Sequence, residues 1–207
     1  MHAGPELERV YQRVLEDLTY RFDGVFTGEE IAAAMARARG DLEPTAKVAD
    51  FLPLLVGRFA LEQLQAGAQA QGRAAKPVPE LLFICVHNAG RSQMAAALAE
   101  QLSGGRVHVR TAGSQPCEGI NPQVVAVLAE RGIDLSEAYP KPLSDDVILA
   151  ADVIVTMGCG DACPIHPGKR YEDWDVADPA GQDLETVRAI REDLQTRVSN
   201  LLTELGI

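Results

Sequence analysis

From about residue 80 onward, short apolar runs alternate with segments whose apolar residues recur every three or four positions. The first run, Leu81 to Val86, is continuous, as expected of a strand that is buried on both faces of a sheet. Further strands are expected over 107–111, 152–156 and 171–175, and helices over 91–103, 122–131, 143–150 and 187–205. This alternation predicts an α/β fold with a parallel sheet and helices on both faces.

The first 70 residues contain no convincing strand and favour three helices. Thr27 and Glu30 form a capping-box pattern at the start of the second helix. The third helix is expected over about 45–68, where Pro53 should kink or restart it because proline lacks the amide proton of an interior helix position. We therefore predict a small three-helix bundle over 1–70, a linker over 71–79 that ends in two prolines, and an α/β domain over 80–207.

Charge and hydropathy narrow the class of function. The formal net charge is −11, whereas proteins that bind nucleic acid or anionic membranes are more often basic, so neither partner is expected. No apolar run reaches the length of a membrane helix, and the N-terminus lacks the apolar stretch of a signal peptide. The expectation is a cytoplasmic protein, in which four cysteines do not indicate a structural disulfide framework.

The segment that carries chemistry runs from Cys85 to Ser92, between the first strand and the helix that follows it. A short loop in this position turns backbone N–H groups inward, and the helix N-terminus adds its positive end, so the loop can bind a tetrahedral oxyanion. Arg91 can grip two oxygens of such an anion with its planar guanidinium group. The same field favours a nucleophilic thiolate at Cys85, to which Ser92 can donate a hydrogen bond. The alternative is a merely buried cysteine with a chance arginine six residues on.

Four motifs together resemble the low-molecular-weight tyrosine phosphatase superfamily and, within it, the thiol-dependent arsenate reductases. They are C-V-H-N-A-G-R-S-Q-M-A from Cys85, T-A-G-S at 111–114, V-T-M-G-C-G-D-A-C-P at 155–164 and D-P-A-G at 178–181. The resemblance covers about 80–207 and implies a flavodoxin-like four-stranded parallel sheet. It implies an anion site made by Val86, His87, Asn88, Ala89, Gly90 and Arg91, which arsenate, phosphate or sulfate would occupy.

The resemblance also implies that Asp178 reaches over this loop. When the thiolate attacks an oxyanion, one oxygen must leave with a proton, and a carboxylic acid above the loop can supply that proton. The plainer interpretation is that Asp178 caps a turn before Pro179.

Cys159 and Cys163 favour the reductases over the phosphatases within this superfamily. A phosphatase needs one cysteine, whereas arsenate reduction needs two electrons, which further thiols can supply. The resemblance implies that they relay a disulfide away from Cys85, with thioredoxin as reductant and NADPH as its indirect electron source. Only three residues separate them, fewer than in the best-known thioredoxin-linked relatives, so the order of the relay is open. Relatives that use mycothiol typically lack this pair.

Several alternatives remain at this point. The same cysteines could bind zinc with His166 and His87, but no second closely spaced cysteine pair supports such a site. A phosphatase would use only Cys85, Arg91 and Asp178, and its relatives usually carry an aromatic residue after the proline of D-P-A-G. A third hypothesis is a regulatory protein that senses arsenate.

We therefore predict an arsenate reductase with catalytic residues Cys85, Arg91, Ser92, Asp178, Cys159 and Cys163. It would hold no tightly bound cofactor and no metal in its catalytic site. Some relatives bind potassium near the residue equivalent to Asn88, but the sequence does not locate ligands for it. Cys117 matches no motif, and the sequence leaves the role of the helical bundle and the oligomeric state open.

Overall fold

The computed structural model describes residues 5–45, 51–158 and 163–207. The chain forms two compact units, Met1–Ala75 and Lys76–Ile207. The division falls in the segment for which the sequence predicts a linker; the exact domain boundaries stay a prediction. Among the described helices, none is both long enough and apolar enough to span a membrane.

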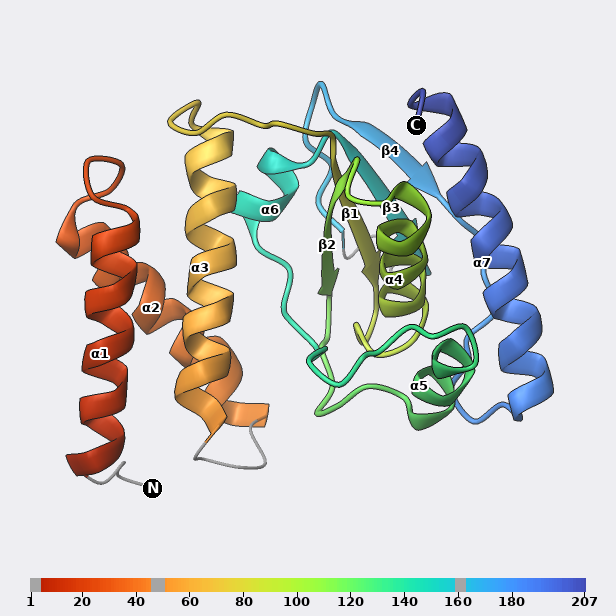
Figure 1. The fold of residues 1–207 in the computed structure, drawn as a ribbon, viewed down its shortest axis with the longest axis horizontal. Helices are drawn as coiled ribbons and strands as arrows, with labels where there is room; N and C mark the ends of the chain where they lie inside the picture. Colours follow the sequence, from red (N-terminus) through yellow and green to blue (C-terminus); the bar gives the residue numbers. More distant parts are fainter. Residues whose placement is uncertain (1–4, 46–50, 159–162) are drawn as a thin grey trace. The chain divides into compact units, whose positions relative to one another are not determined.

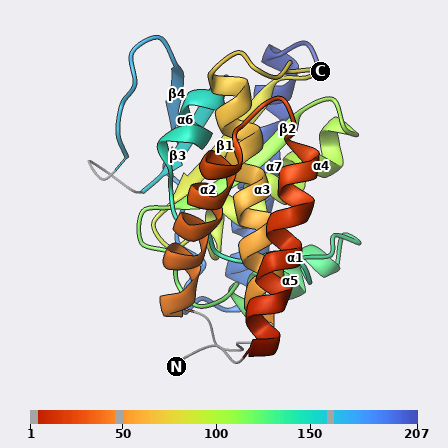
Figure 2. The same ribbon diagram turned by 90° about the vertical axis from the view of Figure 1, so that its left-hand side faces the viewer.

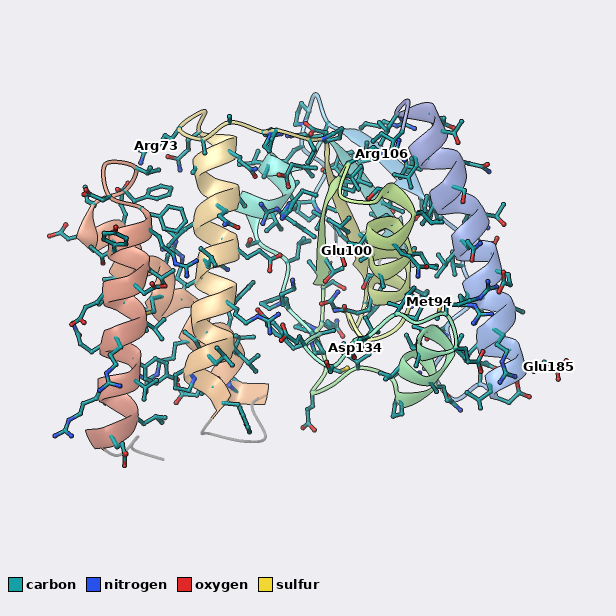
Figure 3. All side chains as sticks on the ribbon, in the orientation of Figure 1. Arg73, Met94, Glu100, Arg106, Asp134 and Glu185 are labelled. Atoms are coloured by element: carbon teal, nitrogen blue, oxygen red, sulfur yellow. The ribbon has the colours of Figure 1, made fainter. Side chains whose placement is uncertain are left out.

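The first unit consists of the helices α1 (Pro5–Arg21), α2 (Gly28–Leu42) and α3 (Leu52–Ala70), with a short 3₁₀ turn at Glu43–Thr45. Each of the three helices packs on the other two (Figures 1 and 2). Its core is apolar and includes Leu18, Ile31, Ala38, Val56, Phe59 and Ala60. Arg73, labelled in Figure 3, lies beyond α3 and donates a hydrogen bond to the carbonyl oxygen of Val25 at 2.9 Å. The predicted three-helix bundle is confirmed.

Two local sequence signals set where these helices begin. The hydroxyl of Thr27 accepts a hydrogen bond from the Glu30 backbone N–H at 3.2 Å, and the Glu30 carboxylate accepts one from the Thr27 N–H at 2.7 Å. The predicted capping box is therefore present. Pro53 occupies the first turn of α3, where its missing N–H costs nothing. Helix α3 thus begins at Leu52, not near Thr45, so of the two effects predicted for Pro53 the restart is confirmed and the kink is not.

In its described residues, the second unit is a four-stranded parallel sheet with four helices. Its strands are β1 (Glu80–Cys85), β2 (His108–Gly113), β3 (Val153–Met157) and β4 (Arg170–Asp173), in the order β2-β1-β3-β4. Its helices are α4 (Arg91–Ser103), α5 (Pro122–Ala129), α6 (Asp145–Ala150) and α7 (Leu184–Glu204). The predicted class, α/β with a preceding helical bundle, is confirmed.

Helices cover both faces of this sheet: α4, α5 and α7 lie on one side and α6 on the other (Figure 1). All six residues of β1 are buried, because it is a central strand. Phe83 packs against Trp174 with ring centroids 5.9 Å apart, and Met94 of α4 (labelled in Figure 3) is fully buried in the same core. Because the strands are parallel, the segments after β1, β3 and β4 all leave from one edge of the sheet, where such folds bind ligands.

Candidate active site

The loop between β1 and α4, residues 86–90, uses its carbonyl groups to hold the surrounding chain. The carbonyl oxygens of residues 85, 86, 87 and 89 accept hydrogen bonds from the backbone N–H groups of Ser114, Gln115, Cys117 and Asn121 at 3.3, 2.8, 3.2 and 2.9 Å. Within the described part of the chain, no backbone N–H of residues 87–90 has a protein acceptor. With the first turn of α4, these N–H groups are free to bind an oxyanion. The loop contains the predicted anion-binding residues Val86 to Gly90.

Asn88 holds the bend of this loop. It is completely buried and has φ of 49°, and it is the one non-glycine residue with a positive φ in the described chain. The strand-end residue Gly113 makes room for it: a Cβ atom there would lie 2.9 Å from the backbone nitrogen of Asn88 and 2.8 Å from the carbonyl oxygen of Val86. A residue held in the left-handed region costs about 1–3 kcal/mol and persists only where its surroundings determine it.

The thiol of Cys85 takes part in a chain of buried hydrogen bonds. Its sulfur lies 3.0 Å from the hydroxyl oxygen of Ser92, which in turn accepts a hydrogen bond from the Asn88 side-chain amide at 2.9 Å. Because Asn88 donates to that oxygen, the hydroxyl proton of Ser92 is available to the sulfur. This is the contact expected if Ser92 stabilises a Cys85 thiolate.

Arg91 and Asp178 meet above the loop. The guanidinium Nη2 of Arg91 donates to Oδ2 of Asp178 at 2.8 Å, and Nη1 lies 3.5 Å from the carbonyl oxygen of Val176. The other carboxylate oxygen of Asp178 accepts from the Ala180 backbone N–H at 2.9 Å. The carboxylate of Asp178 therefore contacts both the turn at Pro179 and the arginine at the anion loop. Its role as the proton donor stays a prediction.

Two glycines permit the close approaches that build the site. A Cβ atom on Gly90 would lie 2.7 Å from Cγ of Pro179, so only a residue without a side chain lets the Asp178 turn rest on the loop. A Cβ atom on Gly158, which has φ of +73°, would lie 2.7 Å from Nη1 of Arg91. The sequence alone gives Gly158 no role, because no spacing rule along the chain expresses its packing against Arg91.

The cysteines fall into two redox states. Cys163 is disulfide-bonded, whereas Cys85 and Cys117 are free thiols. Cys159 lies outside the described residues. The Cys117 sulfur lies 3.2 Å from the carbonyl oxygen of Gly119.

The zinc alternative finds no support in these contacts. A sulfur in a disulfide is not available as a thiolate ligand, and the Nδ1 atom of His87 lies 3.1 Å from the carbonyl oxygen of Gln115. In the ranges that the structure describes, no group of three or more His, Cys, Asp or Glu side chains could hold a metal ion.

The class of site follows from this arrangement: a thiol, a cationic side chain and unpaired N–H groups converge where a tetrahedral oxyanion fits, at the ligand-binding edge of a flavodoxin-like sheet. Residues 80–206 match the family described as low molecular weight phosphotyrosine protein phosphatase. Residues 11–68 match the family described as protein-tyrosine-phosphatase-like, N-terminal domain. The chain belongs to the low molecular weight phosphotyrosine protein phosphatase family.

Individual relatives within this family include several arsenate reductases. The chain is 42% identical to the thioredoxin-dependent arsenate reductase of Corynebacterium glutamicum, with 96% of this chain and 97% of that one covered and a TM-score of 0.85. It is 33% identical over 130 residues to a glutaredoxin arsenate reductase of Synechocystis, which covers 61% of this chain and 98% of the relative. A structure of an arsenate reductase in the phosphate binding state is 32% identical, with a TM-score of 0.54, and covers 61% of this chain and 98% of its own.

Proposed function

We propose that this protein is an arsenate reductase in which Cys85 is the nucleophile and Cys163 belongs to a disulfide relay. The observation that carries the proposal is the division of the cysteines: Cys163 is oxidised to a disulfide while Cys85 keeps a free thiol at the oxyanion loop. A phosphatase of the same fold has no use for the disulfide. Similarity to a named arsenate reductase over nearly the whole chain supports the same conclusion.

The first step is an attack of the Cys85 thiolate on the arsenic atom of arsenate. The N–H groups of the loop and the guanidinium of Arg91 hold the anion, which requires Arg91 to turn from Asp178 toward arsenate oxygens. An S–As bond forms while an As–O bond breaks, and the departing oxygen leaves as water. Asp178 is within reach of that oxygen because it already touches the anion-binding arginine, so it can supply the proton.

The second step transfers electrons. A second thiolate attacks the Cys85 sulfur, an S–S bond forms, and the electron pair of the S–As bond stays on arsenic, which leaves as arsenite. A third thiol then attacks this disulfide and frees Cys85. We assign these two roles to Cys159 and Cys163 without fixing their order, and their disulfide is the end product of the relay.

An external dithiol must reduce that disulfide. We propose thioredoxin, which draws its electrons from NADPH, because the relative that matches over both units carries thioredoxin in its name. Mycothiol is the alternative reductant, and the shorter Synechocystis relative is named for glutaredoxin. Free thiols at Cys85 and Cys117 fit the reducing cytoplasm, where we expect the protein to act.

Phosphate and sulfate should compete with arsenate, because the loop recognises a tetrahedral oxyanion and not the arsenic atom itself. A potassium ion at Asn88 fits less well. The side-chain oxygen of Asn88 already accepts hydrogen bonds from the Lys141 backbone N–H at 2.9 Å and from Gln93 at 3.1 Å. These N–H groups present positive charge where the cation would bind, so the mechanism takes no step through potassium.

The experiment is arsenate-dependent NADPH oxidation with thioredoxin and thioredoxin reductase present. We expect turnover by the wild type and by Cys117→Ser, and its loss in Cys85→Ser and Cys163→Ser. If the Cys163→Ser variant still turns over arsenate, the protein is a reductase but the relay role proposed for Cys163 is wrong. If the wild type ignores arsenate and cleaves an aryl phosphate, the second candidate replaces the first: a phosphatase, which the description of the matched family favours.

A further inference from the structure

We propose that Gln93 is a positioning residue for Cys85: it fixes the direction of the hydrogen-bond chain that ends on the nucleophilic sulfur. The inference rests on the proposed role of Cys85 as nucleophile. Gln93 lies in the first turn of α4, is 6% exposed, and touches none of the atoms that would react. Its whole effect on the chemistry must therefore pass through its neighbours.

Two backbone carbonyl groups fix the orientation of the Gln93 amide. Its Nε2 atom lies 3.1 Å from the carbonyl oxygen of Asn88 and 3.3 Å from that of Tyr139. Carbonyl oxygens only accept hydrogen bonds, so the NH₂ group of Gln93, and not its oxygen, must face them. Gln93 thereby ties α4 to the loop after β1 and to the segment that contains Tyr139.

The same NH₂ group and one backbone N–H fix the amide of Asn88. The side-chain oxygen of Asn88 lies 3.1 Å from Nε2 of Gln93 and 2.9 Å from the backbone nitrogen of Lys141. These two neighbours can only donate, and the Thr111 hydroxyl also donates to the same atom at 3.5 Å. This atom must therefore be the oxygen, and the NH₂ group must point the other way, toward Ser92. Because Gln93 also holds the carbonyl oxygen of Tyr139, it helps place Lys141 two residues further along.

The orientation of the Asn88 amide in turn determines whether Ser92 can donate a hydrogen bond to the thiol of Cys85. Asn88 donates to the hydroxyl oxygen of Ser92 at 2.9 Å, so Ser92 keeps its own proton for the Cys85 sulfur at 3.0 Å. A reversed Asn88 amide would present an oxygen to Ser92, and the hydroxyl proton would turn to that oxygen. The thiolate would lose its donor. Gln93 therefore acts three hydrogen bonds away from the sulfur.

The decisive variant is Gln93→Met, which keeps the length of the side chain and removes both N–H donors. The matched control is Gln101→Met on the same helix, where an exposed glutamine donates to the carbonyl oxygen of Arg131 at 3.2 Å. We would follow alkylation of Cys85 by iodoacetamide in the reduced full-length protein across a range of pH, with the Cys85 peptide quantified by mass spectrometry. Phosphate protection against alkylation measures the anion site separately.

We expect Gln93→Met to move the pH midpoint of Cys85 alkylation upward by about 0.7 unit, so that the rate below the midpoint falls about fivefold. The rate on the high-pH plateau and the phosphate protection should stay within about twofold of wild type, since the loop amides still bind the anion. Gln101→Met should leave all three quantities unchanged. A loop that had merely collapsed would lose phosphate protection, and that result would overturn the proposal.

A double-mutant cycle tests the route. In a Ser92→Ala background the chain to the sulfur is already cut, so Gln93→Met should no longer shift the midpoint. An equal shift in both backgrounds, or no shift in the single variant, refutes the proposal. Should Gln93→Met not fold, Gln93→Glu keeps the shape while replacing the donor with an oxygen, and the same outcomes apply. Alkylation needs no turnover, so a protein inactive toward arsenate would defeat the proposed function without affecting this result.

Discussion

The helical unit and the surroundings of Cys85 differ in whether their buried polar side chains have hydrogen-bond partners. In the helical unit, the hydroxyl of Tyr11 and the side-chain oxygen of Gln63 are buried without a hydrogen-bond partner among the described residues. Around Cys85, by contrast, the fully buried side chains of Asn88 and Ser92 have partners that fix the direction of each hydrogen bond. The helical unit relies on apolar packing, which tolerates buried polar groups without a partner. Around Cys85, the hydrogen bonds fix the orientation of each polar side chain.

This difference predicts how the two regions respond to substitution. A buried polar group without a partner costs about 1–3 kcal/mol, which a core of large apolar residues can absorb. The cost is then one of stability. In the site, the loop amides without a protein acceptor and the Arg91–Asp178 pair are placed to serve a ligand, so a substitution there should change chemistry with little effect on folding.

The largest effect should come from Asp178→Asn. Asparagine keeps an oxygen that can accept from the Ala180 N–H, so the turn should survive, but it cannot donate the proton of a carboxylic acid. We expect kcat for arsenate reduction to fall by about 10²–10⁴-fold, with the unfolding midpoint nearly unchanged. Steady-state kinetics with thioredoxin and a thermal melt measure the two quantities.

The same variant makes a second, opposite prediction for binding. Removing the carboxylate releases Arg91 from its 2.8 Å ion pair, which is partly exposed to solvent and therefore weak. Phosphate should bind about threefold more tightly to Asp178→Asn, as measured by its protection of Cys85 from alkylation. Asp175→Asn, which removes an exposed charge three residues earlier, is the control and should change neither value. Weaker phosphate binding in Asp178→Asn would mean that the carboxylate builds the anion site instead of restraining it.

Much of this site could be predicted because it follows the chain locally. A continuous apolar strand, a six-residue spacing from Cys85 to Arg91 and a helix directly after it determine an anion loop by their order alone. The helix over Arg91–Ser103 agrees with the prediction residue for residue, because its two caps, Gly90 and the left-handed Gly104, are its direct neighbours in the chain. The capping box at Thr27 is local in the same sense.

The parts that escaped prediction depend on residues far apart in the chain. The approach of Gly158 to Arg91 brings the residue after β3 against the first residue of α4, and the bond from Gln93 to the carbonyl oxygen of Tyr139 spans 46 positions. The start of α3 was predicted only as a choice between a kink and a restart at Pro53, and the structure shows the restart, with Pro53 in the first turn. Spacing along a sequence describes none of these contacts.

The next effect concerns stability alone and tests how closely the helical unit packs. In Gly57→Ala, the new methyl group would lie 2.7 Å from Cγ1 of Val14, where α1 meets α3, and valine has little freedom to turn away. Gly40→Ala supplies the reference, because that exposed helical position has nothing within 4 Å. Both variants gain helix propensity, so the difference in unfolding free energy between them isolates packing, and we expect it to be about 1–3 kcal/mol.

The single tryptophan makes this experiment specific to one unit. Trp174 lies in the core of the α/β unit, so its fluorescence follows that unit, whereas circular dichroism follows the helices of both. Gly57→Ala should lower the transition seen by circular dichroism and leave the tryptophan transition and the Cys85 alkylation rate in place. A shift of both transitions together would contradict this prediction, because it would show that the two units unfold as one.

The smallest effect should be electrostatic and confined to the start of α2. The hydrogen bond from the Thr27 backbone N–H, aided by the charge of Arg73, holds the pKa of the Glu30 carboxyl below its ordinary value. Because the pKa is lower in the folded chain than in the unfolded one, the contribution of Glu30 is complete at neutral pH. It is lost as the pH falls through the lowered pKa. Glu30→Gln should therefore lower the urea midpoint seen by circular dichroism slightly at about pH 7, and wild type and variant should converge in acid, once the pH lies below the lowered pKa of Glu30. Glu29→Gln removes the same charge from the same helical turn without the Thr27 bond and should show a smaller dependence on pH. If the two variants lost equal stability, the helix dipole rather than the capping box would account for the effect. Either result should leave Cys85 alkylation unchanged, since Thr27 and Arg73, which bind Glu30, both belong to the helical unit.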